Sequence, residues 1–490
     1  MPMNRTVLLP AAMLLWIGFS GCAKVGPDYQ QPDLVLPATW QAPAEGGLSL
    51  SQSDQQQLAQ WWRLLEDPLL NSFIDRAVAG NLDLEQARMR LFQARASRDI
   101  SSAGLFPTLD AGGSVTRTKG SENRGGGGTL STAYSVGFDA AWELDLFGGR
   151  RRAVEAARAQ LEANREDLRD VLVSLLAEVA LNYIDVRTFQ ARLKIAADNL
   201  AAQQEAFALT RARYQSGLAS ELDVQQARSL VAGTRAQLPV LRTGLANAEN
   251  LLAVLLGLPP GSLAAELQEP VVLAALPLSI AVGIPAETLQ RRPDIRRAER
   301  LLAAQTARIG IATADLYPSF RLSGSIGLDA FSAGRLFSSG SGGYSFGPSV
   351  SWPVFDAGAI AANIKLQTYQ QQEALAAYKS LVLSALAEVE GGLVAYAEEQ
   401  KRYQALQESA DAAGQAAKLA EIQFQAGMIN FTEVLDARRS LLSFQDQQAQ
   451  SAATMSGNLI RLYKALGGGW TSLRLETEPP SPGNDSNDHQ

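Results

Sequence analysis

The sequence predicts a membrane α+β protein in which long α-helices form a coiled-coil barrel, or tunnel, and four β-strands contribute to a transmembrane β-barrel. Three observations lead to this prediction. The chain contains a tandem structural repeat with an offset of about 210 residues. Each copy contains two strand-like segments in which apolar and polar residues alternate. Each copy also contains two long segments with the seven-residue apolar period of a coiled coil.

The inventory of reactive side chains excludes most kinds of catalytic site. The 490 residues include one histidine, His489, and one cysteine, Cys22, and both lie near an end of the chain. A histidine general base, a Cys–His pair, a zinc site of imidazoles or thiolates and a disulfide are therefore out of reach. A carboxylate-only enzyme remains open, but we expect no enzyme, no metal and no cofactor. The net charge of −7 gives no basis for nucleic acid as a partner.

The N-terminus has the features of a bacterial lipoprotein signal peptide. The basic Arg5 precedes an apolar run over residues 7–19, which is too short to span a bilayer comfortably. Small residues then precede Cys22, as in a lipobox, although Phe19 departs from the usual leucine-like residue. We therefore expect residues 1–21 to be removed and Cys22 to carry a covalent lipid. The alternative is an uncleaved anchor helix with an incidental cysteine.

The repeat is visible in pairs of short motifs that share one offset. The pairs are Leu105-Phe106-Pro107 with Leu316-Tyr317-Pro318, Ala177-Glu178-Val179 with Ala387-Glu388-Val389, Tyr214-Gln215-Ser216-Gly217 with Phe424-Gln425-Ala426-Gly427, and Leu256-Gly257 with Leu466-Gly467. The first copy covers residues 81–257 and the second covers residues 292–467. Two copies of one structural unit therefore make up most of the chain.

Each copy predicts two strands, which are residues 108–118, 132–146, 319–329 and 343–355. Along each strand, apolar residues alternate with small or polar ones. A strand that crosses a membrane needs about 9 to 11 residues, with its apolar side chains facing lipid and its polar ones facing a lumen. Aromatic residues near the strand ends are expected at the membrane interface, with ordinary sheet aromatics as the alternative; these residues are Tyr134, Trp142, Tyr344 and Trp352.

Each copy also predicts two long helices, which are residues 150–215, 220–256, 358–425 and 430–466. Leu172, Val179 and Val186 begin a seven-residue register that continues to Tyr214, and the second copy mirrors it. A helix of about 65 residues is on the order of 100 Å long. The helices alone would equally fit a coiled-coil stalk, so the strands decide for a membrane duct.

Topology and hydrogen bonding define how such a chain sits in a membrane. Four strands cannot close a barrel, and an open edge in lipid would leave backbone groups unpaired, so the chain must oligomerise. The two strand-to-strand loops, residues 119–130 and 332–343, lie on one side of the membrane, and every helix lies on the other. Because a lipobox cysteine stays on the periplasmic leaflet, we expect a barrel in the outer membrane and helices in the periplasm.

Three motifs resemble the lipoprotein branch of the TolC-like outer-membrane factor family, the NodT- and OprM-like channels of RND-type multidrug efflux. They are Cys22-Ala23-Lys24-Val25-Gly26-Pro27-Asp28-Tyr29, Arg291-Arg292-Pro293-Asp294 and Tyr463-Lys464-Ala465-Leu466-Gly467-Gly468-Gly469-Trp470. The resemblance spans nearly the whole chain. It implies a homotrimer with a 12-stranded barrel, docked to a periplasmic membrane-fusion adaptor and an inner-membrane RND-type pump, that passively conducts drugs and toxic compounds to the exterior.

The resemblance also implies roles for the segments outside the repeats. Residues 22–80 would form a lipid-anchored N-terminal segment and part of an equatorial region around the tunnel. Residues 258–291 would link the copies within the same region, and residues 468–490 would form a tail that is partly disordered. Gly217 and Gly427 supply the turns between paired helices, where we expect the adaptor to dock; the alternative is that they are simple helix ends.

The closed end of a helical tunnel should lie at these turns, which are farthest from the strands. The gate candidates are therefore Thr432, Glu433 and Asp436 in the second copy and Asp223 in the first. The resemblance implies that Asp436 and Thr432 constrict the pore, although the family often has leucine where Thr432 stands. A ring of carboxylates would repel anions. The alternative, which does not exclude a gate, is that these acids cap or solvate the first turn of a helix.

Other functions fit parts of the pattern. A conduit for secreted protein or metal ions would share the fold and the gate. A non-conducting structural coiled-coil lipoprotein would form soluble trimers without conductance. A periplasmic adaptor would need one helical hairpin flanked by β domains, and the duplication argues against it.

Overall fold

The computed structural model describes residues 24–34, 36–42, 45, 47–49, 58–121, 123, 128, 130–269, 280–281 and 285–470. The expected signal peptide, Cys22 and the tail beyond residue 470 lie outside the described residues, so what the sequence predicts for them stays a prediction.

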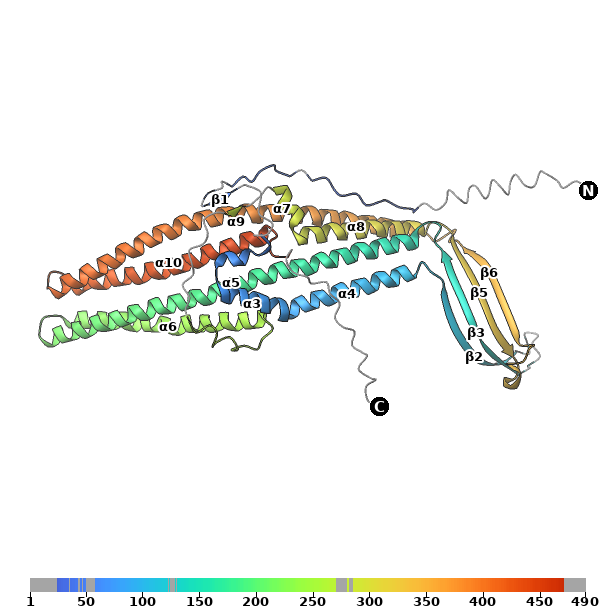
Figure 1. Cartoon of the computed structure of the whole chain (residues 1–490), viewed down its shortest axis with the longest axis horizontal. Helices are drawn as coiled ribbons and strands as arrows, with labels where there is room; N and C mark the ends of the chain where they lie inside the picture. Colours follow the sequence, from blue (N-terminus) through green and yellow to red (C-terminus); the bar gives the residue numbers. More distant parts are fainter. Residues whose placement is uncertain are drawn as a thin grey trace, which may run out of the picture. The chain divides into compact units, whose positions relative to one another are not determined.

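Each repeat folds as a helix, two strands and two long helices (Figure 1). The first copy consists of α4 (Leu82–Ala103), β2 (Thr108–Lys119), β3 (Leu130–Leu144), α5 (Gly149–Gln215) and α6 (Glu221–Leu255). The second consists of α8 (Pro293–Ala314), β5 (Ser319–Ala330), β6 (Gly342–Ser351), α9 (Ala359–Gln425) and α10 (Phe431–Ala465). The long helices match in length, since α5 and α9 each have 67 residues and α6 and α10 each have 35.

The described residues fall into two compact units. The sheet unit comprises Met1–Asp33, Leu91–Arg165 and Arg297–Lys379. The hairpin unit comprises Leu34–Arg90, Glu166–Arg296 and Ser380–Gln490. Helices α5 and α9 each contribute residues to both units, whereas all four long strands belong to the sheet unit.

The sheet unit is built on a four-stranded antiparallel sheet with the order β2-β3-β5-β6. The central pairing, from Tyr134↔Ala330 to Leu144↔Phe320, joins the two repeats edge to edge. Two predicted strand ends are wrong, because β3 stops at Leu144 rather than 146 and β6 stops at Ser351 rather than 355. Ser351 pairs with the first residue of β5, so the residues after it have no partner strand among the described residues. The alternation beyond these points therefore belongs to the connections into α5 and α9.

The hairpin unit contains the paired helices, in which the second copy keeps the predicted seven-residue register. The register positions that are buried along α9 are Val382, Val389, Tyr396, Ala410, Ala417 and Phe424, and Tyr403 is half-buried. In α5 the register holds only as far as Val186. Beyond it, the buried residues at seven-residue spacing are Ala196, Gln203 and Thr210. This series is shifted by three residues from the predicted register, and the predicted last member, Tyr214, is exposed. These buried residues are small or polar, so a search for apolar residues could not find them.

The segments outside the repeats also meet in the hairpin unit. They form the short helices η1 (Trp61–Leu65), α3 (Pro68–Gly80) and α7 (Pro285–Arg291) and the parallel pair β1 (Leu48–Ser49) and β4 (Ile280–Ala281). The Trp61 ring stacks on Tyr463 of α10, with the ring centroids 5.7 Å apart. The Glu390 carboxylate of α9 accepts hydrogen bonds from the backbone N–H groups of Gln41 and Ala42, at 2.7 and 2.9 Å. The N-terminal segment is thereby fastened to a long helix.

Candidate pore and gate

Cross-strand register divides the sheet into two chemically different faces. Rows on one face are Leu109–Ala140–Gly324–Phe346, Ala111–Phe138–Ile326–Tyr344 and Trp142–Leu322–Pro348. Rows on the other are Thr108–Ala141–Ser323–Gly347, Asp110–Asp139–Ser325–Ser345, Gly112–Gly137–Gly327–Gly343 and Ser114–Ser135–Asp329. The first face is apolar and aromatic, and the second is small and polar.

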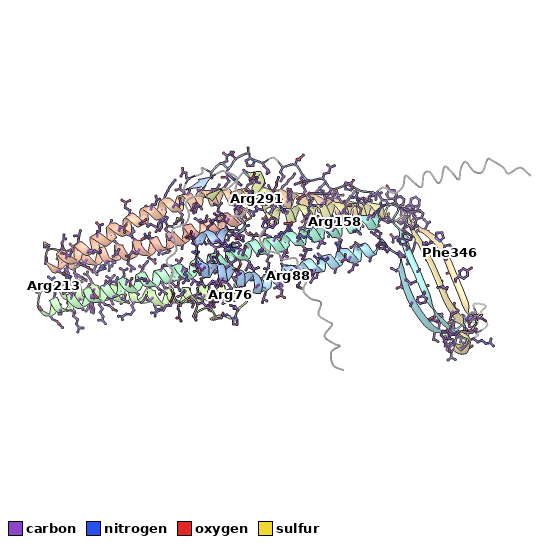
Figure 2. The ribbon with its side chains drawn as sticks, in the orientation of Figure 1. Arg76, Arg88, Arg158, Arg213, Arg291 and Phe346 are labelled. Carbon is purple, nitrogen blue, oxygen red and sulfur yellow. The ribbon has the colours of Figure 1, made fainter. Side chains whose placement is uncertain are left out.

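The apolar face of the sheet is bare in the described part of the chain. Tyr344 is 86% exposed and Phe346 is 79% exposed; Figure 2 marks Phe346 on the last strand. Soluble proteins rarely leave a contiguous apolar surface of this kind in water. Acyl chains are the surroundings that suit it, because lipid-facing strands carry their apolar residues in this alternation.

The polar face carries mostly small side chains, together with charged residues such as Asp110, Asp139 and Asp329. Hydroxyl groups pair across strands, with Ser114 Oγ 2.8 Å from Ser135 Oγ and Ser325 Oγ 2.9 Å from Ser345 Oγ. A complete row of glycines crosses all four strands, Gly112–Gly137–Gly327–Gly343. A face with such short side chains leaves room for water and for solutes next to the sheet.

Three of the predicted interfacial aromatics, Tyr134, Trp142 and Tyr344, lie on the apolar face near the strand ends, and Trp352 directly follows the last residue of β6. The indole N–H of Trp142 donates to the carbonyl of Leu105 at 3.0 Å, and that of Trp352 donates to Leu316 at 3.1 Å. The two repeats thus make the same contact. Tyr134 and Tyr344 lie toward the loop ends of β3 and β6. An exposed indole with its N–H satisfied is suited to a membrane interface, and the girdle itself stays a prediction.

Aspartate caps at the strand-to-helix connections were not found from the sequence. The Asp145 carboxylate accepts from the backbone N–H groups of Arg150 and Arg151, at 3.1 and 2.9 Å. Asp356 likewise accepts from Gly358 and Ile360, at 2.9 and 2.6 Å, and these hydrogen bonds lower the pKa of Asp356. The sequence held a signal for both, because the two residues share the repeat offset and each lies just before a helix.

The two hairpin turns adopt the same glycine-dependent conformation. Gly217 and Gly427 each have φ +74°, in the left-handed region that favours glycine. Their N–H groups donate to Tyr214 and Phe424, at 2.9 and 3.0 Å. The residues that follow, Leu218 and Met428, are exposed. The turns therefore present apolar side chains to the surroundings, and adaptor docking there stays a prediction.

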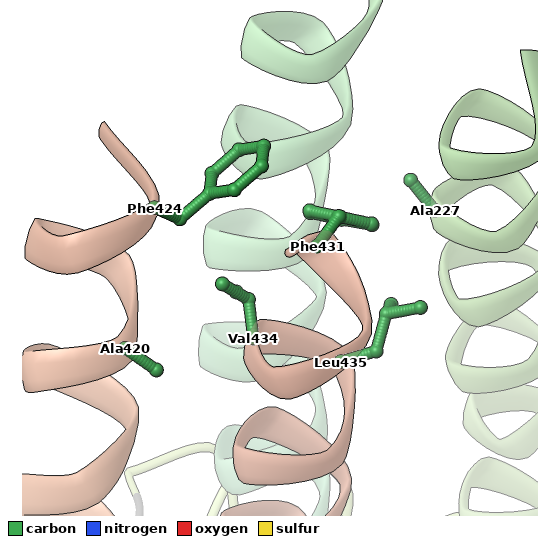
Figure 3. Close-up of a cluster of buried hydrophobic side chains, with 6 residues drawn as sticks. All are labelled: Ala227, Ala420, Phe424, Phe431, Val434 and Leu435. Carbon is green, nitrogen blue, oxygen red and sulfur yellow. The ribbon is translucent and has the colours of Figure 1, made fainter. Parts of the chain in front are cut away.

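Three of the four gate candidates lie on the exposed side of the first turns of α10. Thr432, Glu433 and Asp436 are exposed, while the alternating positions Phe431, Val434 and Leu435 are buried. Figure 3 shows these buried side chains in a cluster with Phe424, Ala420 and Ala227, which spans both hairpins. Asp436 has an exposed ion pair with Arg439 at 3.7 Å. The cluster thus fixes which face of α10 the candidates occupy.

The fourth candidate, Asp223, is engaged in helix capping. Its carboxylate accepts from the backbone N–H of Ser220 at 2.9 Å, and its own N–H donates to the Ser220 hydroxyl at 3.2 Å. This capping box satisfies the first turn of α6. At the matching place in the second copy, Asn430 makes no such side-chain bond. The two hairpins therefore differ at the turn, and the acids of α10 are not used for capping in this way.

Polar contacts between the hairpins were also missed by the sequence analysis. Arg213, in the last turn of α5, donates to the carbonyl of Phe424 at 2.7 Å. Arg192 forms a two-pronged ion pair with Asp446 of α10, at 2.6 and 3.1 Å. A single sequence shows that such residues are charged but not which helix they face. These contacts link α5 to both helices of the other hairpin.

Comparison with known proteins connects this arrangement to a family. The family model described as "Outer membrane efflux protein" matches residues 73–258 and 284–468. The solvent efflux pump outer membrane protein SrpC of Pseudomonas putida is 35% identical over 472 residues, which cover 94% of this chain and 98% of SrpC. Nodulation protein T of Rhizobium leguminosarum bv. trifolii is 33% identical over 455 residues, which cover 93% of this chain and 96% of that protein.

Solved structures show the same likeness over the fold. The outer-membrane channel OprN is 38% identical, has a TM-score of 0.85, and the match covers 91% of this chain and 100% of OprN. A membrane protein from Pseudomonas aeruginosa is 30% identical with a TM-score of 0.83, and the match covers 91% of this chain and 100% of that one. The family resemblance expected from the sequence is confirmed: the chain belongs to the outer membrane efflux protein family.

Proposed function

We propose that this chain forms the outer-membrane channel of a tripartite efflux system and passively conducts small molecules, such as drugs and toxic compounds, to the exterior. The observation that carries this function is the two-faced sheet, apolar on one side and small and polar on the other, joined in each repeat to a 67-residue helix. The names of the related proteins support the class of cargo, because they describe solvent, toluene and antibiotic efflux. The protein needs no catalytic step and no cofactor for passive conduction.

The sheet edges favour an oligomer, which we propose to be a homotrimer with 12 strands. In the described chain, β2 and β6 each pair on one side only. An unpaired edge in lipid is unfavourable by several kcal/mol per backbone group, so neighbouring copies must supply partners. Helix α9 also exposes several large apolar side chains that a neighbour would cover; these are Leu366, Tyr369, Leu383, Val394, Leu419 and Ile422.

Two further parts of the proposal concern the ends of the chain and of the hairpins. Cys22 carries the covalent lipid of the mature protein. The turns at Gly217 and Gly427 receive a periplasmic adaptor of an inner-membrane RND-type pump, and the exposed Leu218 and Met428 beside them suit such a contact.

The gate lies at the hairpin tips, where Asp436, Thr432 and Glu433 form its inner surface. Three copies would bring three sets of these exposed acids together and repel anions. The apolar cluster and the Arg213–Phe424 contact hold the two hairpins of one copy together behind this ring. Separation of the hairpins would widen the tip.

Single-channel recording of the purified protein in a planar bilayer tests the function. We expect discrete conductance steps that favour cations at low ionic strength. Folded trimers that never conduct would refute the channel function and favour the alternative, a structural coiled-coil lipoprotein. Restored solvent or drug tolerance in cells that lack their own efflux channel would separate small-molecule export from a conduit for protein or metal ions.

Replacement of Asp436 with alanine tests the gate. We expect a several-fold increase in the entry of a vancomycin-sized solute into cells that lack the pump, because the variant removes both bulk and charge from the tip. Asp411→Ala is the matched control, since Asp411 is an exposed carboxylate of α9 away from the turn. Equal entry in both variants and the wild type would remove Asp436 from the gate.

A further inference from the structure

We propose that Arg152 is the docking site for the chain's own N-terminal segment, residues 24–29, and that this docking fixes the lipid-bearing end of the mature chain at the strand-to-helix junction. The lipid itself rests on the proposed function. Arg152 is a positioning residue in this proposal, because it acts on the anchor through the segment that it holds.

The Arg152 side chain is buried, and most of its polar contacts are with the segment. The residue has 0% exposure although it lies in the first turn of α5. Its Nε donates to the carbonyl of Val25 at 3.0 Å, and its Nη2 donates to the carbonyl of Gly26 at 3.0 Å. Nη2 also pairs with the Asp28 carboxylate at 2.9 Å, and Nη1 pairs with Glu155 at 3.0 Å. One guanidinium thus donates hydrogen bonds to two backbone carbonyls of the segment and forms an ion pair with one of its carboxylates.

Two glycines make the approach of the segment possible. Gly26 has φ +82°, and a Cβ atom there would lie 2.4 Å from the Cα of Gly310 in α8. A Cβ atom at Gly310 would lie 2.8 Å from the Arg152 side chain. Both distances are shorter than any ordinary van der Waals contact of a Cβ atom. The segment, α8 and the arginine therefore fit together only where these positions carry no side chain.

The docked segment contacts both repeats. On the first copy, the N–H of Val25 donates to the carbonyl of Phe147 at 3.1 Å, and Lys24 pairs with Glu155 at 3.2 Å. On the second copy, the Tyr29 hydroxyl donates to Glu299 of α8 at 2.9 Å. All of these residues belong to the sheet unit. The segment therefore joins the two repeats, with its contact on the first copy close to the end of β3 and its contact on the second copy along α8.

The pairing of the buried arginine with the segment stabilises the docked state. A buried charge that loses its partners is strongly unfavourable, whereas a paired and hydrogen-bonded one is tolerated. Without the segment, Arg152 would keep only Glu155 of its own helix. Cys22 is joined to Lys24 by two peptide units, which reach at most about 7 Å. Holding Lys24 therefore confines the acylated residue to the immediate neighbourhood of the junction.

Limited trypsin digestion of the folded, detergent-purified protein tests the docking. Trypsin cleaves after Lys24, and the next basic residue along the chain is Arg63, so cleavage at Lys24 produces a defined chain that begins at Val25. We expect the wild type to resist and Arg152→Met to lose the acylated peptide at least tenfold faster, as read by intact mass. Arg158→Met is the matched control, because Arg158 lies on the same helix, is 75% exposed and pairs only locally with Glu162.

A second variant keeps the test independent of the arginine. Gly26→Ala leaves Arg152 in place but blocks the approach to Gly310, and we expect it to expose Lys24 as well. General loosening of the fold would also speed cleavage on α5, for example after Arg158, whereas undocking speeds cleavage after Lys24 alone. Wild-type resistance at Lys24 in both variants would overturn the proposal.

The untreated protein separates this proposal from the function on which it rests. An intact mass without an acyl chain would show that the protein carries no lipid anchor. The docking would then still be tested by the rates of trypsin cleavage after Lys24. Conductance of the same preparation reports on the channel independently, since a non-conducting protein can still show protection of Lys24 that depends on Arg152.

Discussion

At the scale of single residues, Arg213 is placed to hold two helices from different repeats. Its guanidinium donates to the Phe424 carbonyl and lies 4.6 Å from the centroid of the Phe424 ring. The C-terminal end of a helix carries partial negative charge, which favours a cation there. The second copy has Gln423 where the first copy has Arg213, so α9 carries no arginine at this position that could make the equivalent contact with α5.

Arg213→Ala should weaken the contact between the hairpins. Loss of a hydrogen bond from a charged group at a half-buried site is unfavourable by about 1–2 kcal/mol, which is roughly a 5- to 30-fold shift toward separated tips. We expect increased entry of a large solute into cells that lack the pump. Arg211→Ala is the control, because Arg211 is exposed one half-turn earlier on α5. Indistinguishable entry in the two variants would show that the contact does not restrain the gate.

Single residues were the part of the site that the sequence predicted least well. The exposed position of Asp436 followed from its place after the turn, because the helical pattern of Phe431, Val434 and Leu435 leaves it on the opposite face. Asp223 occupies the corresponding turn but is taken up by its capping box with Ser220. The role of Arg152 carried no sequence signal, because its partners in the N-terminal segment lie more than a hundred residues away along the chain.

At the scale of secondary-structure elements, the prediction was most successful where a short period repeated many times. The alternation along β3 and the heptads along α9 each repeat a local rule, and their register is seen in the structure. The C-terminal part of α5 departs from the apolar register because its buried positions include Gln203 and Thr210. Asn199 there donates to Gln445 of α10 at 2.8 Å, so polar side chains carry this part of the packing.

The row of glycines across the sheet contains two kinds of position, one with no room for a Cβ atom and one with open space. A Cβ atom at Gly137 would lie 2.6 Å from the carbonyl oxygen of Ile326, whereas a Cβ atom at Gly112 meets nothing within 4 Å. We expect Gly137→Ala to destabilise the β3–β5 pairing by about 1–3 kcal/mol, as overpacking does. Gly112→Ala should be neutral. The measurement is the temperature at which the folded oligomer converts to monomer on unheated and heated gels. An unchanged temperature for Gly137→Ala would show that the strands can move apart freely.

At the scale of the whole molecule, the function depends on the two faces meeting different solvents. The register shows that Ser345 and Phe346, neighbours on β6, lie on opposite faces of the sheet. Nothing in the described chain covers either face, so the surroundings must provide lipid for one and water for the other. The family match, over both repeats, supports this arrangement for the complete protein.

Cysteine substitution at these neighbouring positions distinguishes the two surroundings. Ser345→Cys should react with a membrane-impermeant, water-soluble thiol reagent at least roughly tenfold faster than Phe346→Cys, because an apolar environment disfavours the thiolate. The native Cys22 would be blocked by its lipid. Equal rates in outer-membrane preparations would mean that the sheet does not sit in a bilayer and would remove the basis for a channel.

The glycine, serine, threonine and alanine residues of the polar face have a consequence for selectivity. A molecule that passes along this wall meets peptide groups, short hydroxyls and the carboxylates of Asp110, Asp139 and Asp329, which distinguish solutes by charge but offer uncharged ones much the same contacts. Such a surface has few means to tell a toluene from an antibiotic. The decision about what leaves the cell must then be made upstream, and exchange of this duct between pumps should change the export rate while the range of exported compounds follows the pump.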